Sequence, residues 1–112
     1  MKIEVKKASR NDLSFVSALS FETEPVLGFS LSRRFEEVLS QTGHSILLCF
    51  VDGEISGMMS VTIIDGLSKK FPLSVFSGGK IKPGADREVV SAALIAKGEE
   101  LSRSFGCKKI LS

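Results

Sequence analysis

The stretch KIKPGADREVVSAALI, residues 80–95, decides the fold of this chain. It opens as a short apolar strand, passes through Pro83 and Gly84, and continues into small and aliphatic residues typical of a helix. Backbone N–H groups without intrahelical partners point outward at a helix N-terminus, which makes such a turn a common place to bind a phosphate. The stretch therefore predicts a strand-to-helix turn and a candidate phosphate site.

The helix that follows this turn is predicted over about residues 86–105. Gly106 comes next as a stop signal. Apolar residues recur along one side of the helix, namely Val90, Leu94, Leu101 and Phe105.

Predicted strands flank this helix. PLSVFSGGKI, residues 72–81, has a strand pattern with a bulge at Gly78-Gly79, and CKKIL, residues 107–111, has that of a short final strand. A strand, a crossover helix and a second strand form a parallel unit, expected to be right-handed, that binds ligands where strands lead into helices. In this chain that end is residues 83–90.

Upstream, the sequence predicts a β-hairpin. SILLCFVDGEISGMMSVTII, residues 45–64, holds two apolar runs joined at Asp52-Gly53, a strong hairpin-turn dipeptide. The two strands are predicted at residues 45–51 and 54–64.

The chain begins with a strand and a helix. KIEVKKA, residues 2–8, alternates with Ile3 and Val5 on one face. Ser9 and Asp12 have the spacing of a capping box, so a helix is predicted from there to about residue 21.

A second, amphipathic helix is predicted from Ser30 to a stop at Gly43, because Pro25 and Gly28 break the preceding pattern. The predicted order is β-α-α-β-β-β-α-β, an α/β (α+β) fold with a mixed sheet. All 112 residues fit one domain, 1–112.

Composition argues against several classes of function. The net charge of +2 is spread along the chain and Trp and Tyr are absent, so no nucleic-acid partner is predicted. No apolar run reaches the length of a membrane span, and the location is predicted to be cytoplasmic. Cys49 and Cys107 are interpreted as reduced core residues, and no metal site is predicted.

The arrangement resembles the GNAT superfamily of N-acetyltransferases over essentially the whole chain. IEVKKASRNDLSFVSAL is similar to the family's first strand and helix, and LLCFVDGEISGMMSV to its hairpin, with Gly57 in the third strand. GKIKPGADREVVSAALIAKGEELSRSFGCKKIL resembles the fourth strand, cofactor loop, long helix and fifth strand. Here Pro83, Leu94 and Ile95 keep the family spacing.

The resemblance implies that acetyl-CoA binds in a wedge between the fourth and fifth strands, and that an amine acceptor receives the acetyl group. Backbone groups of Lys80, Ile81 and Lys82 would face the pantetheine arm. The following loop would bind the pyrophosphate, and its predicted cofactor-binding residues are Gly84, Ala85, Arg87, Glu88, Val89 and Val90.

The loop departs from the family pattern, in which glycines allow the backbone to approach the phosphates. Val89 or Val90 stands where the first glycine is expected, and the carboxylates of Asp86 and Glu88 would repel a pyrophosphate. In the alternative interpretation, Asp86 only caps the helix and no phosphate binds. Both interpretations remain open at this point.

The chain is also shorter than is usual for the family, since the usual C-terminal helix and two further strands are lacking. The family often draws a tyrosine acid from that part, and this chain has no tyrosine. The fifth strand would be an exposed sheet edge, which predicts a homo-oligomer that covers it.

Candidate catalytic groups are Glu22 and Glu24, between the first two helices, and Ser74 and Ser77 on the fourth strand, which could orient a water. Each has an ordinary alternative, as a solvated loop acid or as a serine in a half-exposed strand. His44 is interpreted as a surface residue before a strand, and Met58 and Met59 as packing residues.

Two functions follow from these features. The first is a GNAT-like N-acetyltransferase that transfers an acetyl group from acetyl-CoA to a primary amine. The second is a degenerate GNAT-like module that binds a protein or small ligand without chemistry.

Overall fold

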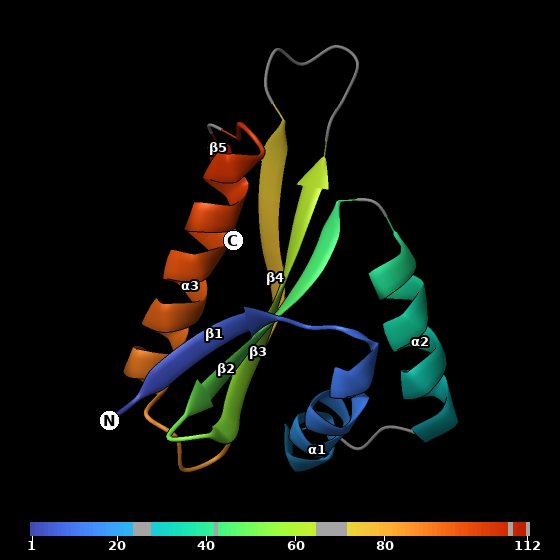
Figure 1. Cartoon of the computed structure of the whole chain (residues 1–112), viewed down its shortest axis with the longest axis vertical. Helices are drawn as coiled ribbons and strands as arrows, with labels where there is room; N and C mark the ends of the chain where they lie inside the picture. Colours follow the sequence, from blue (N-terminus) through green and yellow to red (C-terminus); the bar gives the residue numbers. More distant parts are fainter. Residues whose placement is uncertain (24–27, 42, 65–71, 108, 112) are drawn as a thin grey trace.

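A five-stranded mixed sheet with helices on both faces forms the fold (Figure 1). The structure is a computed structural model that describes residues 1–23, 28–41, 43–64, 72–107 and 109–111. Its strands lie in sequence order across the sheet: β1 (Ile3–Lys7), β2 (His44–Val51), β3 (Glu54–Ile64), β4 (Leu73–Ile81) and β5 (Lys109–Leu111). Neighbouring strands are antiparallel except β4 and β5, which are parallel.

The helices lie in two layers. They are η1 (Arg10–Asp12), a short 3-10 turn, then α1 (Leu13–Thr23), α2 (Gly28–Ser40) and α3 (Arg87–Ser104). Figure 1 shows α3 on one side of the sheet and α1 and α2 on the other. The predicted order and fold class are therefore confirmed, including the parallel β4-α3-β5 unit.

Several predicted boundaries differ from the structure by one or two residues. The second helix begins at Gly28 rather than Ser30, because the entropic cost of glycine weakens a helix interior but does not prevent a helix from starting there. His44 lies in β2 rather than before it. The last strand excludes Cys107, which lies in the turn after α3.

Two apolar clusters fill the space between the layers. The cluster beneath α3 contains Leu47, Cys49, Met59, Val61, Phe76, Val90 and Leu94, and the one beneath α1 and α2 contains Ala8, Val16, Phe35, Ile46 and Leu48. Met59 belongs to the first cluster and Met58 packs against the second, so both methionines are packing residues on opposite faces, as predicted. Burial also raises the pKa of the Cys49 thiol.

The buried face of α3 differs from the predicted one. It consists of Val90, Leu94, Gly98 and Ser102, whereas Phe105 is 53 % exposed and was wrongly placed on it. A Cβ atom on Gly98 would lie 2.8 Å from the Phe76 ring, and one on Gly57 would lie 2.5 Å from Val90 Cγ1. The helix therefore approaches the sheet closely at two glycines.

The predicted bulge in β4 is present. Between the pairs Met58↔Lys80 and Ser60↔Ser77, β4 contains one more residue than β3, and Gly78 there has a φ of +63°.

The pairing between β4 and β5 is short. Its register runs only over Leu73↔Lys109, Ser74↔Ile110 and Val75↔Leu111. In the described part of the chain, β4 from Phe76 to Ile81 therefore has no strand partner on the β5 side. This unpaired edge of β4 leads directly into the turn before α3.

Candidate functional site

The turn from β4 to α3 is fixed by backbone hydrogen bonds. Lys82 N–H donates to Ser56 O on β3 at 2.9 Å, and Ala85 N–H donates to Lys82 O at 3.1 Å. Gly84 has a φ of +89°, a left-handed conformation that favours glycine. The predicted loop residues Gly84 and Ala85 therefore form a closed turn that directs the chain into α3.

Asp86 caps the helix that begins after this turn. Its Oδ1 accepts a hydrogen bond from Val89 N–H at 3.2 Å, and its carbonyl accepts one from Val90 N–H at 3.0 Å. The predicted cap is thus present. Within the described residues the N–H groups of Arg87 and Glu88 have no hydrogen-bond acceptor, so two outward-facing donors remain at this helix N-terminus.

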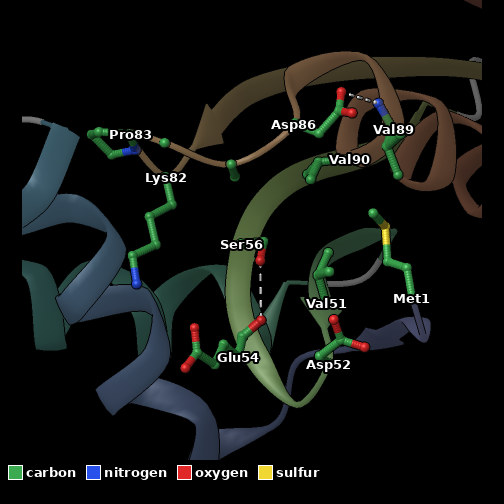
Figure 2. A pocket seen from close by; sticks show the side chains of 12 residues that line it. Met1, Val51, Asp52, Glu54, Ser56, Lys82, Pro83, Asp86, Val89 and Val90 are labelled. Carbon is green, nitrogen blue, oxygen red and sulfur yellow. Dashed lines mark hydrogen bonds between the residues drawn. The ribbon is translucent and has the colours of Figure 1, made fainter.

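The two valines of the loop occupy different positions. Val90 belongs to α3, where it is fully buried on the helix face that packs on the sheet, and its side chain points toward the hairpin, as Figure 2 shows. Since its side chain is in the core and its N–H donates to Asp86, Val90 offers no free group to a ligand. Val89 is half-buried beside the loop. The backbone approach to the helix N-terminus is therefore not blocked by Val90.

The unpaired edge of β4 offers a further backbone donor. Lys82 N–H points to β3, and neighbouring residues of an antiparallel strand direct their backbone groups to opposite sides. The N–H of Ile81 therefore points away from β3, toward the side without a strand partner.

A small cavity of about 190 Å³ lies where this edge meets α3. Among the described residues that line it, Arg87 alone is charged, and the others are Met58, Met59, Gly79, Ile81, Ser91, Leu94 and Ile95. Residues 87, 91 and 95 are four apart and so share one face of the helix. An arginine and a serine thus border an otherwise apolar hollow beside the open strand edge.

A larger cavity, of about 520 Å³, lies on the opposite side of the loop, between α3 and the β2-β3 hairpin (Figure 2). Its charged lining residues are Lys82 and the carboxylates Asp52, Glu54 and Asp86. The two hollows differ in charge, since Arg87 makes the smaller one cationic. An anionic group is therefore favoured on the side of the β4 edge.

Among the described residues, the fold does not bring the predicted catalytic candidates together. Glu22 is in the last turn of α1, and Glu24 lies outside the described residues. Ser77 is exposed on β4, opposite Ser60 of β3 and next to the bulge. Each of these roles stays a prediction.

Two residues interpreted as ordinary surface polar groups have defined partners. Ser74 is fully buried rather than half-exposed, and its hydroxyl lies 2.7 Å from that of Ser102 on α3. His44 is half-buried, with Nδ1 3.4 Å from Thr62 Oγ1. These partners come from distant segments, which is why their local sequence did not indicate them.

Sequence reasoning missed Ser91 and Gly79 as lining residues of the smaller cavity. The available signal was the four-residue spacing from Arg87 to Ser91 and Ile95, which places them on one helix face. That the face borders the β4 edge depends on the docking of α3, which the sequence pattern alone does not specify.

The described helices and polar side chains can be checked for a membrane span and for a metal site. Among residues 1–23, 28–41, 43–64, 72–107 and 109–111, no helix combines the length and apolarity needed to span a bilayer. The same residues contain no cluster of three or more His, Cys, Asp or Glu side chains arranged to hold a metal ion.

Known structures share the fold of this chain. A GNAT family acetyltransferase from Staphylococcus aureus superposes with a TM-score of 0.85 at 18% identity, over 99% of this chain and 85% of the other. An aminoglycoside N-acetyltransferase in complex with CoA superposes with a TM-score of 0.84 at 17% identity, over 99% of this chain and 76% of the other. A transcriptional regulator from Bacillus halodurans superposes with a TM-score of 0.81 at 20% identity, over 98% of this chain and 80% of the other.

No protein-family model and no curated protein sequence matches the chain. The likeness is therefore one of structure, and it shows that the chain has a GNAT-like fold. One fold can carry several functions, so activity has to be argued from the site.

Proposed function

We propose that the chain is a GNAT-like N-acyltransferase that transfers an acetyl group from acetyl-CoA to a primary amine. The observation that carries the proposal is the unpaired edge of β4, which ends next to a helix N-terminus with two unpaired N–H groups and Arg87. The fold is shared with an aminoglycoside N-acetyltransferase that binds CoA, which supports a similar use of this edge.

The residues present fit a CoA molecule in two parts. The N–H groups of Arg87 and Glu88, with the Arg87 guanidinium, would bind the pyrophosphate, because helix N-termini and arginine both favour phosphate oxygens. The β4 edge at Ile81 would hold the pantetheine arm through its backbone. The carboxylate of Asp86 opposes this binding by repulsion, so we expect a modest affinity.

Acetyl-CoA, when bound, supplies an acyl group activated as a thioester. The Ile81 N–H would donate a hydrogen bond to the acyl carbonyl oxygen and stabilise the negative charge that develops there as the amine attacks. The rigid β4 edge would also position the carbonyl, which removes much of the entropic barrier to attack. Glu22, Glu24 and Ser77 remain candidates for orienting or deprotonating the acceptor. The departing thiolate would take up a proton, for which we propose solvent as the source.

Thermal unfolding with CoA tests the binding step. A ligand present at a hundred times its Kd stabilises the native state by about 2.7 kcal/mol, which for a domain of this size raises Tm by several degrees. We expect Arg87→Glu to reduce this shift, and Gly84→Val to abolish it because of the positive φ at Gly84. Arg103→Glu, the same charge change at the exposed far end of α3, should leave the shift intact.

Release of free thiol from acetyl-CoA in the presence of a panel of primary amines tests the chemical step. Amine-dependent release that Arg87→Glu lowers and Arg103→Glu does not would support the acyltransferase. Absence of any CoA-dependent stabilisation would reject it.

A second function, a binding module without chemistry, is favoured by one contact. The Asp86 carboxylate already occupies the Val89 N–H, a donor that a phosphate would otherwise use. In that case CoA would neither stabilise the chain nor release thiol. Asp86→Ser separates the two functions, because serine keeps the cap and removes the charge. The acyltransferase predicts a larger CoA shift for this variant, whereas the binding module predicts none.

A further inference from the structure

A third cavity lies at the other end of the sheet from the α3 N-terminus. It has a volume of about 430 Å³ and lies where β1 leaves the sheet. Among the described residues, β1 pairs with β2 only from Leu47 to Val51, and one further backbone hydrogen bond joins Ala8 N–H to Ile46 O at 2.7 Å. Its lining residues are Lys7, Ala8, Ser9, Arg10, Leu39, Gln41, Gly43, His44, Ser45, Ile63 and Phe105. The 18 residues of α3, about 27 Å at 1.5 Å per residue, separate Phe105 from the candidate CoA loop.

The described charged residues that line this cavity are cationic. Lys7 and Arg10 line it, His44 adds an imidazole, and no carboxylate is among the lining residues that the structure describes. Within the described residues neither Lys7 nor Arg10 forms an ion pair. The neighbouring carboxylate, Asp12, is engaged by Lys6 and by the Ser9 N–H and hydroxyl. The cavity therefore offers two uncompensated cations to an anionic ligand.

A buried serine, Ser45, is among the residues that line this cavity. Ser45 is only 7 % exposed, and its hydroxyl has no hydrogen-bond partner within the described residues. Among the same described residues, every side-chain oxygen or nitrogen that is fully shielded from solvent has a hydrogen-bond partner. The Ser45 hydroxyl therefore keeps some contact with solvent, and because Ser45 lines this cavity we infer that the hydroxyl is available to a ligand there.

The remaining walls are apolar. Ala8, Leu39, Ile63 and Phe105 line the cavity, and the Phe105 side chain is 53 % exposed although it is large and aromatic. The C-terminus of α3 carries the negative end of the helix dipole. Its partial charge is reduced here, because Ser102 O accepts hydrogen bonds from the N–H groups of Phe105 and Cys107. A ligand with an apolar body and one anionic group matches both kinds of wall.

From these features we propose that this cavity is a second binding site, for a small organic anion that joins a carboxylate or phosphate to an apolar or aromatic body. Lys7 and Arg10 bind the anionic group, the Ser45 hydroxyl donates a hydrogen bond to it, and the apolar body packs against Ile63 and Phe105. The site is separate from the proposed CoA site and does not depend on it.

Titration of the ¹⁵N-labelled full chain with benzoate, followed by amide chemical shifts, tests the proposal. We expect saturable shifts at Gly43, Ser45 and Phe105, with weaker binding of inorganic phosphate, which lacks the apolar body, and none of benzylamine, which reverses the charge. Tighter binding of phenyl phosphate than of benzoate would assign the anionic group as phosphate, and the reverse as carboxylate.

Variants locate the binding. The pair Lys7→Gln and Arg10→Gln should weaken benzoate binding at least about tenfold, since two charge-assisted hydrogen bonds are lost. The matched pair Lys2→Gln and Arg103→Gln, on exposed ion-paired residues, should not change it. Arg87→Glu should also leave it unchanged.

Two results would overturn the site. One is the absence of saturable shifts with both benzoate and phenyl phosphate. The other is equal affinity in the Lys7 and Arg10 double variant or equal binding of benzylamine, either of which would show that the cations do not select the ligand.

Discussion

The most heavily hydrogen-bonded single side chain near the N-terminus is that of Asp12. Asp12 is 4 % exposed, and its carboxylate accepts hydrogen bonds from the Ser9 N–H, the Ser9 hydroxyl and Lys6 Nζ. The Ser9 N–H lowers the pKa of Asp12 most, followed by Lys6. The predicted capping box is thus confirmed, and it is joined by a lysine that the local pattern did not include.

This lowered pKa makes stability depend on pH. As pH falls, the unfolded chain takes up a proton near the ordinary value of 3.8, before the folded chain does. The stabilisation is therefore fully present above that value and is lost as pH falls through the lower folded-state pKa. Urea unfolding of the wild type and Asp12→Asn at several pH values should show a stability difference that shrinks below about pH 4. A difference that stays constant to pH 2 would contradict this assignment.

A second prediction at this scale concerns the buried pair Ser74 and Ser102. The Ser102 hydroxyl donates to Gly98 O at 2.8 Å, so its single proton is used and the Ser74 hydroxyl must donate to Ser102. Ser102→Ala would leave the Ser74 donor without an acceptor, at a cost of about 1–3 kcal/mol. Ser74→Ala removes the donor itself and should cost about 1 kcal/mol. Urea unfolding should therefore rank Ser102→Ala as the more harmful change, and the reverse order would contradict the assigned direction.

At the scale of elements, the docking of α3 on the sheet determines where the candidate site lies. Gly57 and Gly98 allow the helix to approach β3 and β4, and Val90 fills the space above Gly57. The helix itself could be predicted from its caps and apolar spacing. Its buried face could not be predicted, because Gly98 and Ser102 are buried without being strongly apolar, whereas the apolar Phe105 is exposed at the C-cap.

Gly98→Ala tests this docking. Alanine favours a helix over glycine by about 1 kcal/mol, but its Cβ would lie 2.8 Å from the Phe76 ring and 2.9 Å from Met59 Cε. Overpacking usually costs about 1–3 kcal/mol, so we expect net destabilisation in thermal or urea unfolding. Gly79→Ala, with no atom within 4 Å of the added Cβ, is the matched control and should be nearly neutral. A stabilised Gly98→Ala chain would show that α3 does not pack so closely.

At the scale of the whole molecule, the order and direction of the strands could be predicted from local signals. The Asp52-Gly53 turn, the alternation of Ile3 and Val5 and the helix between two strands each limit the topology to few choices. The short β4-β5 pairing and the cavities could not be predicted, because they depend on contacts between distant segments. For the same reason the sequence could not decide whether the loop binds a phosphate. The structure shows that Asp86 caps the helix, and phosphate binding stays a prediction.

The exposed edge also bears on assembly. The sequence predicts a homo-oligomer that covers the fifth strand, and the unpaired part of β4 from Phe76 to Ile81 extends the surface available to a second copy. Light scattering over a wide concentration range should give a mass of twice one chain at high concentration. If the second copy occupies the β4 edge, saturating CoA should shift the equilibrium toward monomer. A constant monomeric mass would reject the oligomer.

The turn between β4 and α3 is anchored at both ends, by Lys82 to Ser56 on one side and by Val90 above Gly57 on the other. A loop held in this way has few conformations to lose when a ligand binds, so the entropic cost of binding should be small. Differences in affinity among ligands at this turn would then depend mainly on the electrostatic interaction of each ligand with Arg87 and Asp86. Ionic strength, rather than temperature, should be the variable that discriminates them best.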